Sequence, residues 1–238
     1  MLKILLIIPS YNEEKNVKKV FDTVCGYNDS HEQKYDALFI NDGSKDNTEQ
    51  ELCLYGCEHI TLIQNLGIGG AVQTGYKYAL EHNYDIAVQM DGDGQHDINC
   101  VETVIKPILN GTANLVIGSR FIDFSSSEFK SSAFRRLGIK LISTLINIKT
   151  GKRIYDTTSG FRAADRSVIK NFAVNYPTEY PEPISTTFLL KSGYKVDEVA
   201  VSMHERENGV SSIQSWKNVY YMVNVILSII LLKGKEND

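Results

Sequence analysis

The stretch Asp91-Gly92-Asp93-Gly94-Gln95-His96 holds two carboxylates two residues apart, directly after the apolar run Ile86–Met90. The intervening glycines let the backbone approach a ligand closely. Carboxylate oxygens are hard donors that suit Mg²⁺ or Mn²⁺, and Mg²⁺ is usually held by one or two carboxylates together with substrate phosphates. The stretch therefore predicts a metal site at Asp91 and Asp93 that a phosphorylated ligand completes.

An EF-hand calcium loop is the main alternative for this stretch, because Glu102 stands at its twelfth position, where that loop has its bidentate ligand. The sixth position is His96, although the loop needs glycine there for its sharp turn. A strand, rather than a helix, is predicted before Asp91. These two departures exclude the EF-hand.

The glycine-rich segment Asn65-Leu66-Gly67-Ile68-Gly69-Gly70 is a second place where chemistry is expected. A dinucleotide-binding fingerprint would need glycine in place of Val72, and a P-loop starting at Gly70 would need lysine in place of Tyr76. What remains is a turn with small side chains at a helix N-terminus, where backbone amides can bind the negative charge of a ligand. An ordinary tight turn is the alternative.

Four apolar runs, each followed by polar turn residues and a helical pattern, must position these groups. The runs are Ile4–Ile8, Ala37–Ile40, Ile60–Ile63 and Ile86–Met90. Such alternation predicts an α/β fold with a largely parallel sheet. A polar cluster lies just past each run, at 9–13, 41–46, 65–70 and 91–97, and ligands bind at that edge of open α/β sheets.

Composition limits the function classes. The 238 residues include 25 Lys and Arg against 29 Asp and Glu, and a net charge of −4 argues against a nucleic-acid partner. The chain opens without a signal peptide and has only four cysteines (Cys25, Cys53, Cys57 and Cys100), which favours the cytoplasm. Cys53 and Cys57 could share a helix face, but no second pair at zinc spacing accompanies them, so we expect structural or incidental thiols.

The ordered set of motifs resembles the inverting family 2 glycosyltransferases of the GT-A fold, in particular the subgroup similar to dolichyl- or polyprenyl-phosphate sugar synthases. The motifs lie at 8–14, 41–48, 65–70, 91–96, 118–121 and 156–162, and the resemblance covers residues 1 to about 213. It implies a Rossmann-like three-layer α/β/α arrangement with a mostly parallel central sheet and C-terminal amphipathic helices.

The resemblance also implies roles at a nucleotide-sugar site. Pro9, Tyr11 and Glu13 would form the wall at the base and ribose, Asp42 would face the base, and Asp46 would support its loop. Asp91 would orient the ribose or sugar, and Asp93 would bind the metal, with Gln95 as a further ligand. The full nucleotide-sugar set is Pro9, Tyr11, Glu13, Asp42, Asp46, Asn65, Gly67, Gly69, Gly70, Asp91, Arg120 and Arg206.

The chemistry of sugar transfer explains these residue types. The leaving nucleoside diphosphate gains negative charge, which a divalent cation stabilises as a Lewis acid. A hydroxyl acceptor would also need a base, whereas a phosphate acceptor would not. Glu182 is the first candidate for the base, Glu179 the reserve and Asp156 the third.

Cationic and apolar segments point to the acceptor. Arg120 and the pair Arg135-Arg136 resemble positions that meet the phosphates of a polyprenyl acceptor or donor. The segment 134–146 and the tail Trp216–Leu232 are apolar with basic flanks, which suits either a membrane surface or a homo-oligomer contact. The apolar run Val219–Leu232 is too short to span a bilayer. We expect a glycosyltransferase domain at 1–213 and an apolar helix at 214–238.

These observations predict a metal-dependent hexosyltransferase that uses Mg²⁺ or Mn²⁺. The donor would be a nucleotide sugar, with UDP favoured over GDP, and the acceptor a lipid-linked or glycan molecule of cell-surface polysaccharide or glycoconjugate synthesis. A polyprenyl-phosphate sugar synthase is the alternative. A sugar nucleotidyltransferase and a non-catalytic nucleotide-binding protein are more remote. The expected location is the cytoplasm, at the inner face of the cell membrane.

Overall fold

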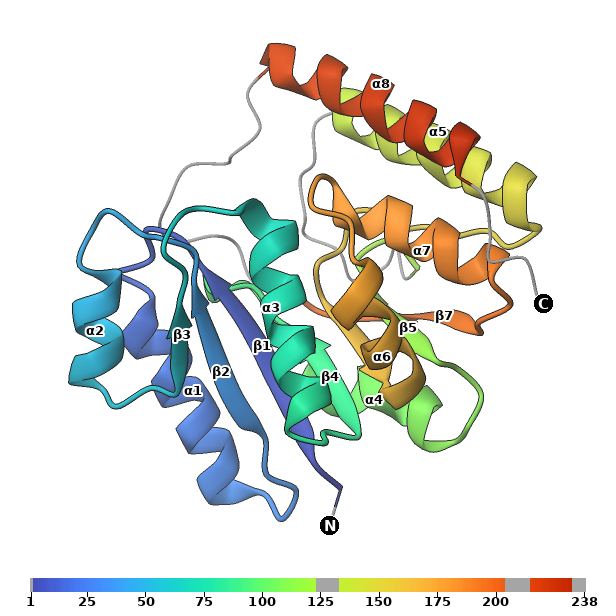
Figure 1. Ribbon diagram of the computed structural model, residues 1–238. Coiled ribbons are helices and arrows are strands. Elements are labelled where there is room, and N and C mark those ends of the chain that lie inside the picture. Colours follow the sequence, from blue (N-terminus) through green and yellow to red (C-terminus); the bar gives the residue numbers. More distant parts are fainter. Residues whose placement is uncertain (1, 123–132, 204–214, 233–238) are drawn as a thin grey trace.

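One seven-stranded sheet forms the centre of the molecule (Figure 1). The computed structural model describes residues 2–122, 133–203 and 215–232, with side chains described except at 133–137 and 215–221. The strands are β1 (Ile4–Ser10), β2 (Asp36–Asn41), β3 (His59–Thr61), β4 (Ile86–Gln89), β5 (Leu115–Ser119), β6 (Arg162–Asp165) and β7 (Val196–Ala200). Their order across the sheet is β3-β2-β1-β4-β6-β5-β7.

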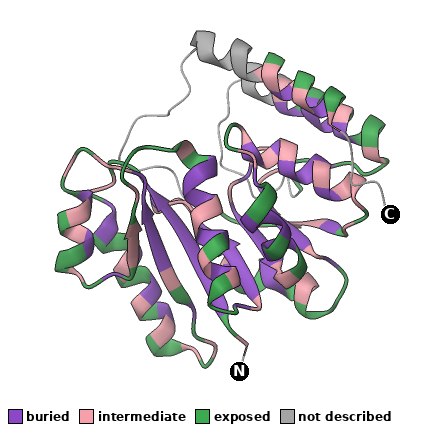
Figure 2. Cartoon of the chain, in the orientation of Figure 1, coloured by how far each residue is buried: buried purple, intermediate pink, exposed green. Residues whose placement is uncertain are grey.

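Helices cover both faces of this sheet. They are α1 (Val17–Ser30), α2 (Thr48–Leu54), α3 (Gly67–Glu81), α4 (Cys100–Leu109), α5 (Ala133–Thr150), α6 (Arg166–Asn175), α7 (Pro181–Lys191) and α8 (Ser215–Leu231). Apolar side chains of α1, α2 and α4 join the core on one face, and those of α3 and α5 to α8 join the core on the other. Every residue of β1 is buried as a result, and Figure 2 shows the central strands almost wholly buried. The predicted three-layer α/β/α fold is confirmed.

The sheet is parallel except at β6, which runs antiparallel to both β4 and β5. The sequence motifs did not predict this strand. Its first residue, Arg162, pairs with Gln89, the last residue of β4. Because β6 runs in the opposite direction, its start lies at the edge where β4 and β5 end. The fold therefore brings the motif 156–162 to the same edge as the acidic stretch 91–97.

The first helix begins later than the sequence pattern indicates. A cap at Ser10 or Asn12 followed by Glu13, Glu14, Val17, Val20 and Phe21 predicts a helix that already includes Glu13 and Glu14, whereas α1 begins at Val17. The backbone N–H of Glu13 donates to Thr48 Oγ1 at 2.9 Å, and that of Glu14 donates to Asp46 Oδ2 at 3.2 Å. Side chains at the start of α2 and in the loop before it thus bind these amides, and the segment forms a loop at the sheet edge.

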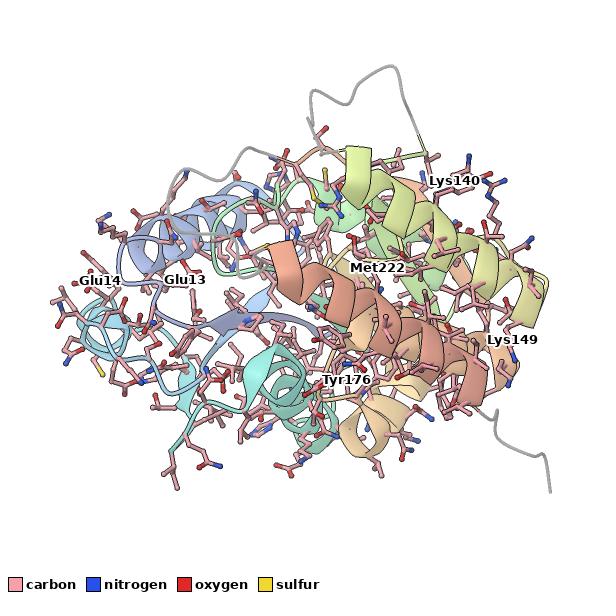
Figure 3. The ribbon with its side chains drawn as sticks, turned by 90° about the horizontal axis from the view of Figure 1, so that it is seen from above. Glu13, Glu14, Lys140, Lys149, Tyr176 and Met222 are labelled. Atoms are coloured by element: carbon pink, nitrogen blue, oxygen red, sulfur yellow. The ribbon has the colours of Figure 1, made fainter. Side chains whose placement is uncertain are left out.

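The C-terminal helix α8 packs beside α5 and against α7 (Figures 1 and 3). Val225 and Ile229 are fully buried in this contact, and Lys149 Nζ of α5 donates to the carbonyl of Ile230 at 3.2 Å. The opposite side of α8 exposes apolar side chains, namely Val223, Leu227, Ile230 and Leu231. Within the described ranges, every helix is too short or too polar to cross a membrane.

Candidate active site

The crevice between β1 and β4 is the geometric centre of the site. After β1 the chain adds β2 and β3 on one side, then returns to place β4 on the other side of β1. Such a reversal of strand order leaves a crevice at the carboxyl ends of the two strands, where ligands of α/β proteins bind. Pro9 lies in the last part of β1 and Tyr11 directly follows that strand, while Asp91 and Asp93 come just after β4. Tyr11 is 42% exposed and open to a ligand.

Asp42 joins two of the predicted clusters. Its Oδ1 accepts the backbone N–H of Leu66 at 2.7 Å, and its backbone carbonyl accepts Asn65 Nδ2 at 3.1 Å. Burial raises the pKa of this carboxyl group, and the backbone amides of Leu66 and Gly67 partly oppose that rise. The glycines predicted to form a turn lie in the first turn of α3, which begins at Gly67. The loop after β2 and the start of α3 therefore form one continuous wall.

Asp46 holds the loop after β2 in place. Its Oδ1 accepts the N–H of Thr48 at 3.0 Å, while Oδ2 accepts the N–H of Glu14. The loop is also fastened to the first segment by Asn12, whose side chain accepts the N–H of Lys45 at 2.8 Å. Glu13 Oε2 accepts Asn16 Nδ2 at 2.5 Å. Asp46 and Glu13 thus bind protein groups at the edge of the wall.

The acidic stretch after β4 is ordered by His96. Its Nδ1 accepts the N–H of Asp91 at 2.9 Å, which leaves the ring proton on Nε2, 3.6 Å from Asp91 Oδ2. The ring stacks on Phe161 with centroids 4.8 Å apart. Sequence reasoning gave His96 no role, yet its ring binds the Asp91 backbone and lies beside the Asp91 carboxylate.

Asp93 is buried, and its Oδ1 accepts the N–H of Gln95 at 3.0 Å. The Asp91 side chain is 37% exposed and so remains open to a ligand. Two carboxylates and an amide oxygen within five residues form an all-oxygen donor set. That set fits Mg²⁺ or Mn²⁺ better than a soft metal.

Gly160 brings the motif 156–162 against the acidic stretch. A Cβ atom at this position would lie 2.9 Å from Asp91 Oδ1 and 3.4 Å from Gln89 Nε2. Only glycine permits this approach without displacing the Asp91 carboxylate. Gly69 does the same for another loop, because a Cβ there would lie 2.3 Å from the carbonyl oxygen of Pro177. The segment that carries Glu179 therefore packs directly on the glycine-rich turn.

Asp156 and Arg120 form a closed ion pair. Arg120 Nε donates to Asp156 Oδ2 at 2.7 Å and Nη2 donates to Oδ1 at 2.9 Å. Asp156 is completely buried, and its backbone N–H donates to Glu198 Oε1 at 2.8 Å. Both carboxylate oxygens of Asp156 thus accept hydrogen bonds from Arg120, and the Arg120 guanidinium is paired within the protein.

Glu182 lies in the first turn of α7, beside the completely buried Arg162. Arg162 Nη1 donates to the Glu182 carbonyl at 3.0 Å and Nε donates to the Ser159 carbonyl at 2.8 Å. Burial raises the pKa of the Glu182 carboxyl group, and Arg162 partly opposes that rise. Glu182 is therefore the predicted base whose surroundings favour a role in proton transfer, whereas Glu179 is exposed.

Sequence reasoning missed three side chains near Glu182, those of Gln89, Arg162 and Tyr76. Gln89 lies on β4, and its Oε1 accepts a hydrogen bond from Tyr176 Oη at 3.2 Å. Arg162 Nη2 and Tyr76 Oη are buried without a hydrogen-bond partner among the residues that the structure describes. In sequence, Gln89 reads as a strand residue and Arg162 as the end of a motif. Only the pairing of β4 with β6 reveals that they are neighbours.

Two predicted groups cannot be placed. Arg206 lies outside the described residues, as do the side chains of Arg135 and Arg136.

A family model named glycosyl transferase family 2 matches residues 5–172, which is most of the chain and includes all the clusters described above up to Arg162. The chain belongs to this family. The resemblance drawn from the sequence motifs is confirmed, and the protein is a glycosyltransferase.

Two relatives of this glycosyltransferase match it over most of their length. UDP-N-acetylglucosamine–dolichyl-phosphate N-acetylglucosaminyltransferase of Methanococcus voltae is 32% identical, over 99% of this chain and 98% of the relative. Polyprenol monophosphomannose synthase of Mycolicibacterium smegmatis is 29% identical, over 88% of this chain and 80% of the relative. The glycosyltransferase therefore lies in the polyprenyl-phosphate sugar synthase-like subgroup.

A solved structure shares the fold of this glycosyltransferase. Glucosyl-3-phosphoglycerate synthase of Mycobacterium tuberculosis, crystallised with Mn²⁺, uridine diphosphate and phosphoglyceric acid, superposes with a TM-score of 0.70 at 18% identity. The match covers 97% of this chain and 78% of that one. At this identity the likeness establishes the GT-A fold alone.

Proposed function

We propose that the protein is an inverting polyprenyl-phosphate sugar synthase that transfers a sugar from a UDP-sugar to a polyprenyl phosphate. The observation that carries the proposal is the end-to-end match to a dolichyl-phosphate N-acetylglucosaminyltransferase, 99% of this chain against 98% of that relative. Of the two acceptor classes left open by the sequence, this similarity favours the lipid phosphate over a glycan.

The described side chains suit the donor. Tyr11 and the wall built on Asp42 lie where the base and ribose would bind, and Asn65, Gly67 and Gly70 line the turn beside that wall. Asp91, Asp93 and Gln95 would hold Mg²⁺ or Mn²⁺ on the diphosphate. When bound, this ion would neutralise the charge that develops on the leaving group.

The acceptor determines whether a base is needed. A phosphate oxygen is already ionised near neutral pH, so in the proposed reaction no group must remove a proton from it. Glu182 would then orient a sugar hydroxyl or the acceptor. Its raised pKa is the one observation that favours the second candidate function, transfer to a hydroxyl acceptor with Glu182 as base.

The paired helices suit contact with a lipid acceptor. The exposed side of α8 carries Leu227 and Leu231, and the neighbouring α5 exposes Leu141 and Ile148. Lys140 is exposed on the same helix (Figure 3). An apolar surface with basic groups suits an anionic membrane face. We propose that 214–238 is an accessory segment that docks the 1–213 domain on the membrane, rather than a subunit contact.

The experiment is a transfer assay with radiolabelled sugar nucleotides and Mn²⁺. Purified protein is given a panel of UDP- and GDP-linked sugars with either a polyprenyl phosphate or the matching polyprenol in detergent. We expect label in the lipid fraction with one UDP-sugar and the phosphate acceptor. Label on the polyprenol or on a glycan, with none on polyprenyl phosphate, would overturn the proposal.

The Asp93→Asn variant tests the proposed role of Asp93 in metal binding. It keeps the size of the side chain and removes its charge. We expect transfer to be lost while the melting temperature in the absence of metal is retained. In the wild type, Mn²⁺ with UDP should raise the melting temperature, because a ligand that binds only the native state stabilises it. Unchanged transfer by Asp93→Asn would contradict the assignment of the metal site.

A further inference from the structure

Three side chains of types that can bind a metal lie close together where α2 meets β3. Glu49 and Cys53 lie one turn apart on α2, and His59 begins β3. His59 Nε2 is 3.3 Å from Glu49 Oε1 and 3.9 Å from Cys53 Sγ. A donor atom from each of the three residues lies within 4.8 Å of those of the other two.

We propose that Glu49, Cys53 and His59 bind a zinc ion, with water as the fourth ligand. Zinc is bound tetrahedrally at about 2.0–2.1 Å by His nitrogen, at about 2.0–2.2 Å by carboxylate oxygen and at about 2.3 Å by Cys sulfur. These bond lengths place the nitrogen and oxygen about 3.4 Å apart and the nitrogen and sulfur about 3.6 Å apart. The observed 3.3 and 3.9 Å are close to both values.

The histidine is already in the tautomer that a metal requires. His59 Nδ1 lies 2.8 Å from the backbone carbonyl of Cys57, and because a carbonyl only accepts, Nδ1 must carry the proton. In neutral His59, therefore, Nε2 directs a lone pair at the Glu49 carboxylate. Those two groups repel each other unless a proton or a cation lies between them. Metal-ligating histidines characteristically donate their other nitrogen to a carbonyl in this way.

The carboxylate is likewise oriented from behind. Glu49 Oε2 accepts Asn41 Nδ2 at 2.8 Å and also accepts a hydrogen bond from Thr61 Oγ1. Both bonds fall on Oε2, which leaves Oε1 facing His59. Cys53 is exposed, so an ion can enter from solvent. Two of the three ligands, His59 and Glu49, are therefore oriented by outer partners, and the third, Cys53, is accessible to solvent.

This site would fasten part of the nucleotide wall. Asn41, which binds Glu49, also accepts the N–H of Ser44 at 3.1 Å, and it directly precedes Asp42. A zinc ion would hold α2 to β3 and fix the Glu49 carboxylate on which Asn41 rests. The site has a thiolate and an imidazole, so it differs chemically from the all-oxygen set at Asp91 and Asp93.

The test uses the full chain in the Asp93→Asn background, so that metal at the all-oxygen set is not counted. The protein is freed of metal with a chelator and titrated with Co²⁺, followed by absorbance, and with Zn²⁺, followed by calorimetry. We expect one equivalent of each, with a sulfur-to-cobalt charge-transfer band. Binding without that band, or no binding, would overturn the proposal.

Variants locate the ion. Cys53→Ser and His59→Gln should abolish the charge-transfer band and the tight Zn²⁺ site, whereas Cys100→Ser, the matched control, should keep both. Thr61→Val removes one outer hydrogen bond and should weaken Zn²⁺ binding by about 10–100-fold. Tight binding that survives both ligand variants would contradict the assignment.

A measurement on the wild-type side chains does not depend on how the variants fold. Zinc should slow the alkylation of Cys53 by iodoacetamide, followed by mass spectrometry of the peptide that contains it. Cys25, which lies on α1, should be alkylated at the same rate with and without zinc. Equal rates at Cys53 in both conditions would exclude it as a ligand.

Discussion

Arg162 is completely buried and binds two separate carbonyl groups, that of Ser159 at 2.8 Å and that of Glu182 at 3.0 Å. The first belongs to the motif 156–162, whose Gly160 packs against Asp91, and the second belongs to the first turn of α7. A single guanidinium group thus ties the acidic stretch to the helix that carries the candidate base. Arg162 is in this sense a positioning residue.

We predict that Arg162→Gln lowers both stability and transfer. The Glu182 carbonyl keeps the hydroxyl donors Ser185 and Thr186, so the Ser159 carbonyl is the one that loses its donor. A buried carbonyl without a donor costs about 1–3 kcal/mol, and chemical unfolding should show a loss of that size. The turnover number should fall more than the Michaelis constant of the nucleotide sugar rises, because the donor wall on Asp42 is not touched. Steady-state kinetics on both substrates measure the two effects.

Arg166→Gln is the matched control for this variant. Arg166 also binds a carbonyl, that of Tyr84 at 2.9 Å, but it lies at the other end of β6. This change should lower stability and leave the turnover number unchanged. If both variants reduced turnover equally, a general loss of stability would explain the effect and Arg162 would have no positioning role.

Glu182→Gln distinguishes the two acceptor classes by magnitude. Loss of a general base costs about 10²–10⁴-fold in rate, whereas a phosphate acceptor needs no base. With polyprenyl phosphate as acceptor we therefore expect turnover to fall by less than about 10²-fold. A larger loss with that acceptor, together with a lost dependence on pH, would assign proton transfer to Glu182.

The same variant gives a prediction for stability against pH. Burial raises the folded-state pKa of Glu182 above its ordinary value, so ionisation of this group opposes folding. The stability that protonated Glu182 contributes is fully present below the ordinary pKa and is lost as the pH rises through the raised pKa. The free energy of unfolding of Glu182→Gln, taken relative to that of the wild type, should therefore be higher at pH 8 than at pH 4. Urea unfolding at the two pH values measures this difference. A constant difference would mean that the pKa is not shifted.

The sequence predicts most of the fold because its signals are local. Apolar runs followed by polar turns give the strand ends, and the parallel arrangement places those ends at one edge. The direction of a strand relative to its neighbours is not a local signal. Nothing in Arg162–Asp165 therefore indicates that β6 runs antiparallel. The neighbours that depend on that pairing, such as Gln89 and Arg162, were missed for this reason.

The group formed by Glu49, Cys53 and His59 was missed for a related reason. Cys53 was considered with Cys57, one turn further along, because that spacing is visible in sequence. In the structure Cys57 is buried after the end of α2, and the turn there brings His59 back to Cys53. The helical period predicts which residues are neighbours within one helix. It does not predict contacts that a turn creates between that helix and the next strand.

The exposed side of α8 yields a fourth prediction. Leu227 is half exposed, so Leu227→Glu should leave the melting temperature nearly unchanged. If α8 docks on a membrane, this charge should weaken binding to vesicles of anionic phospholipid, measured by co-sedimentation. Ile63→Glu is the matched control, because Ile63 is fully exposed and lies in the loop between β3 and α3 rather than on α8. Equal binding by the two variants would favour a subunit contact instead, with the change then seen in the oligomeric state.

Gly160→Ala tests the contact between the motif 156–162 and the acidic stretch. The added Cβ would lie 2.9 Å from Asp91 Oδ1, so the carboxylate must move. Because Asp91 is a candidate ligand, we expect the affinity for Mn²⁺ in the presence of UDP to fall by about 10-fold or more, as for other groups that orient a metal ligand. Calorimetry with Mn²⁺ and UDP measures this loss.

Gly26→Ala shows what the same change does where there is room. Gly26 lies on α1, and a Cβ there would meet nothing within 4 Å. This variant should gain about 0.5–1 kcal/mol of stability from the better helix propensity of alanine and keep the wild-type affinity for Mn²⁺. If Gly160→Ala also kept that affinity, Asp91 would not be a metal ligand, and Asp93 with Gln95 would remain as the candidate ligands.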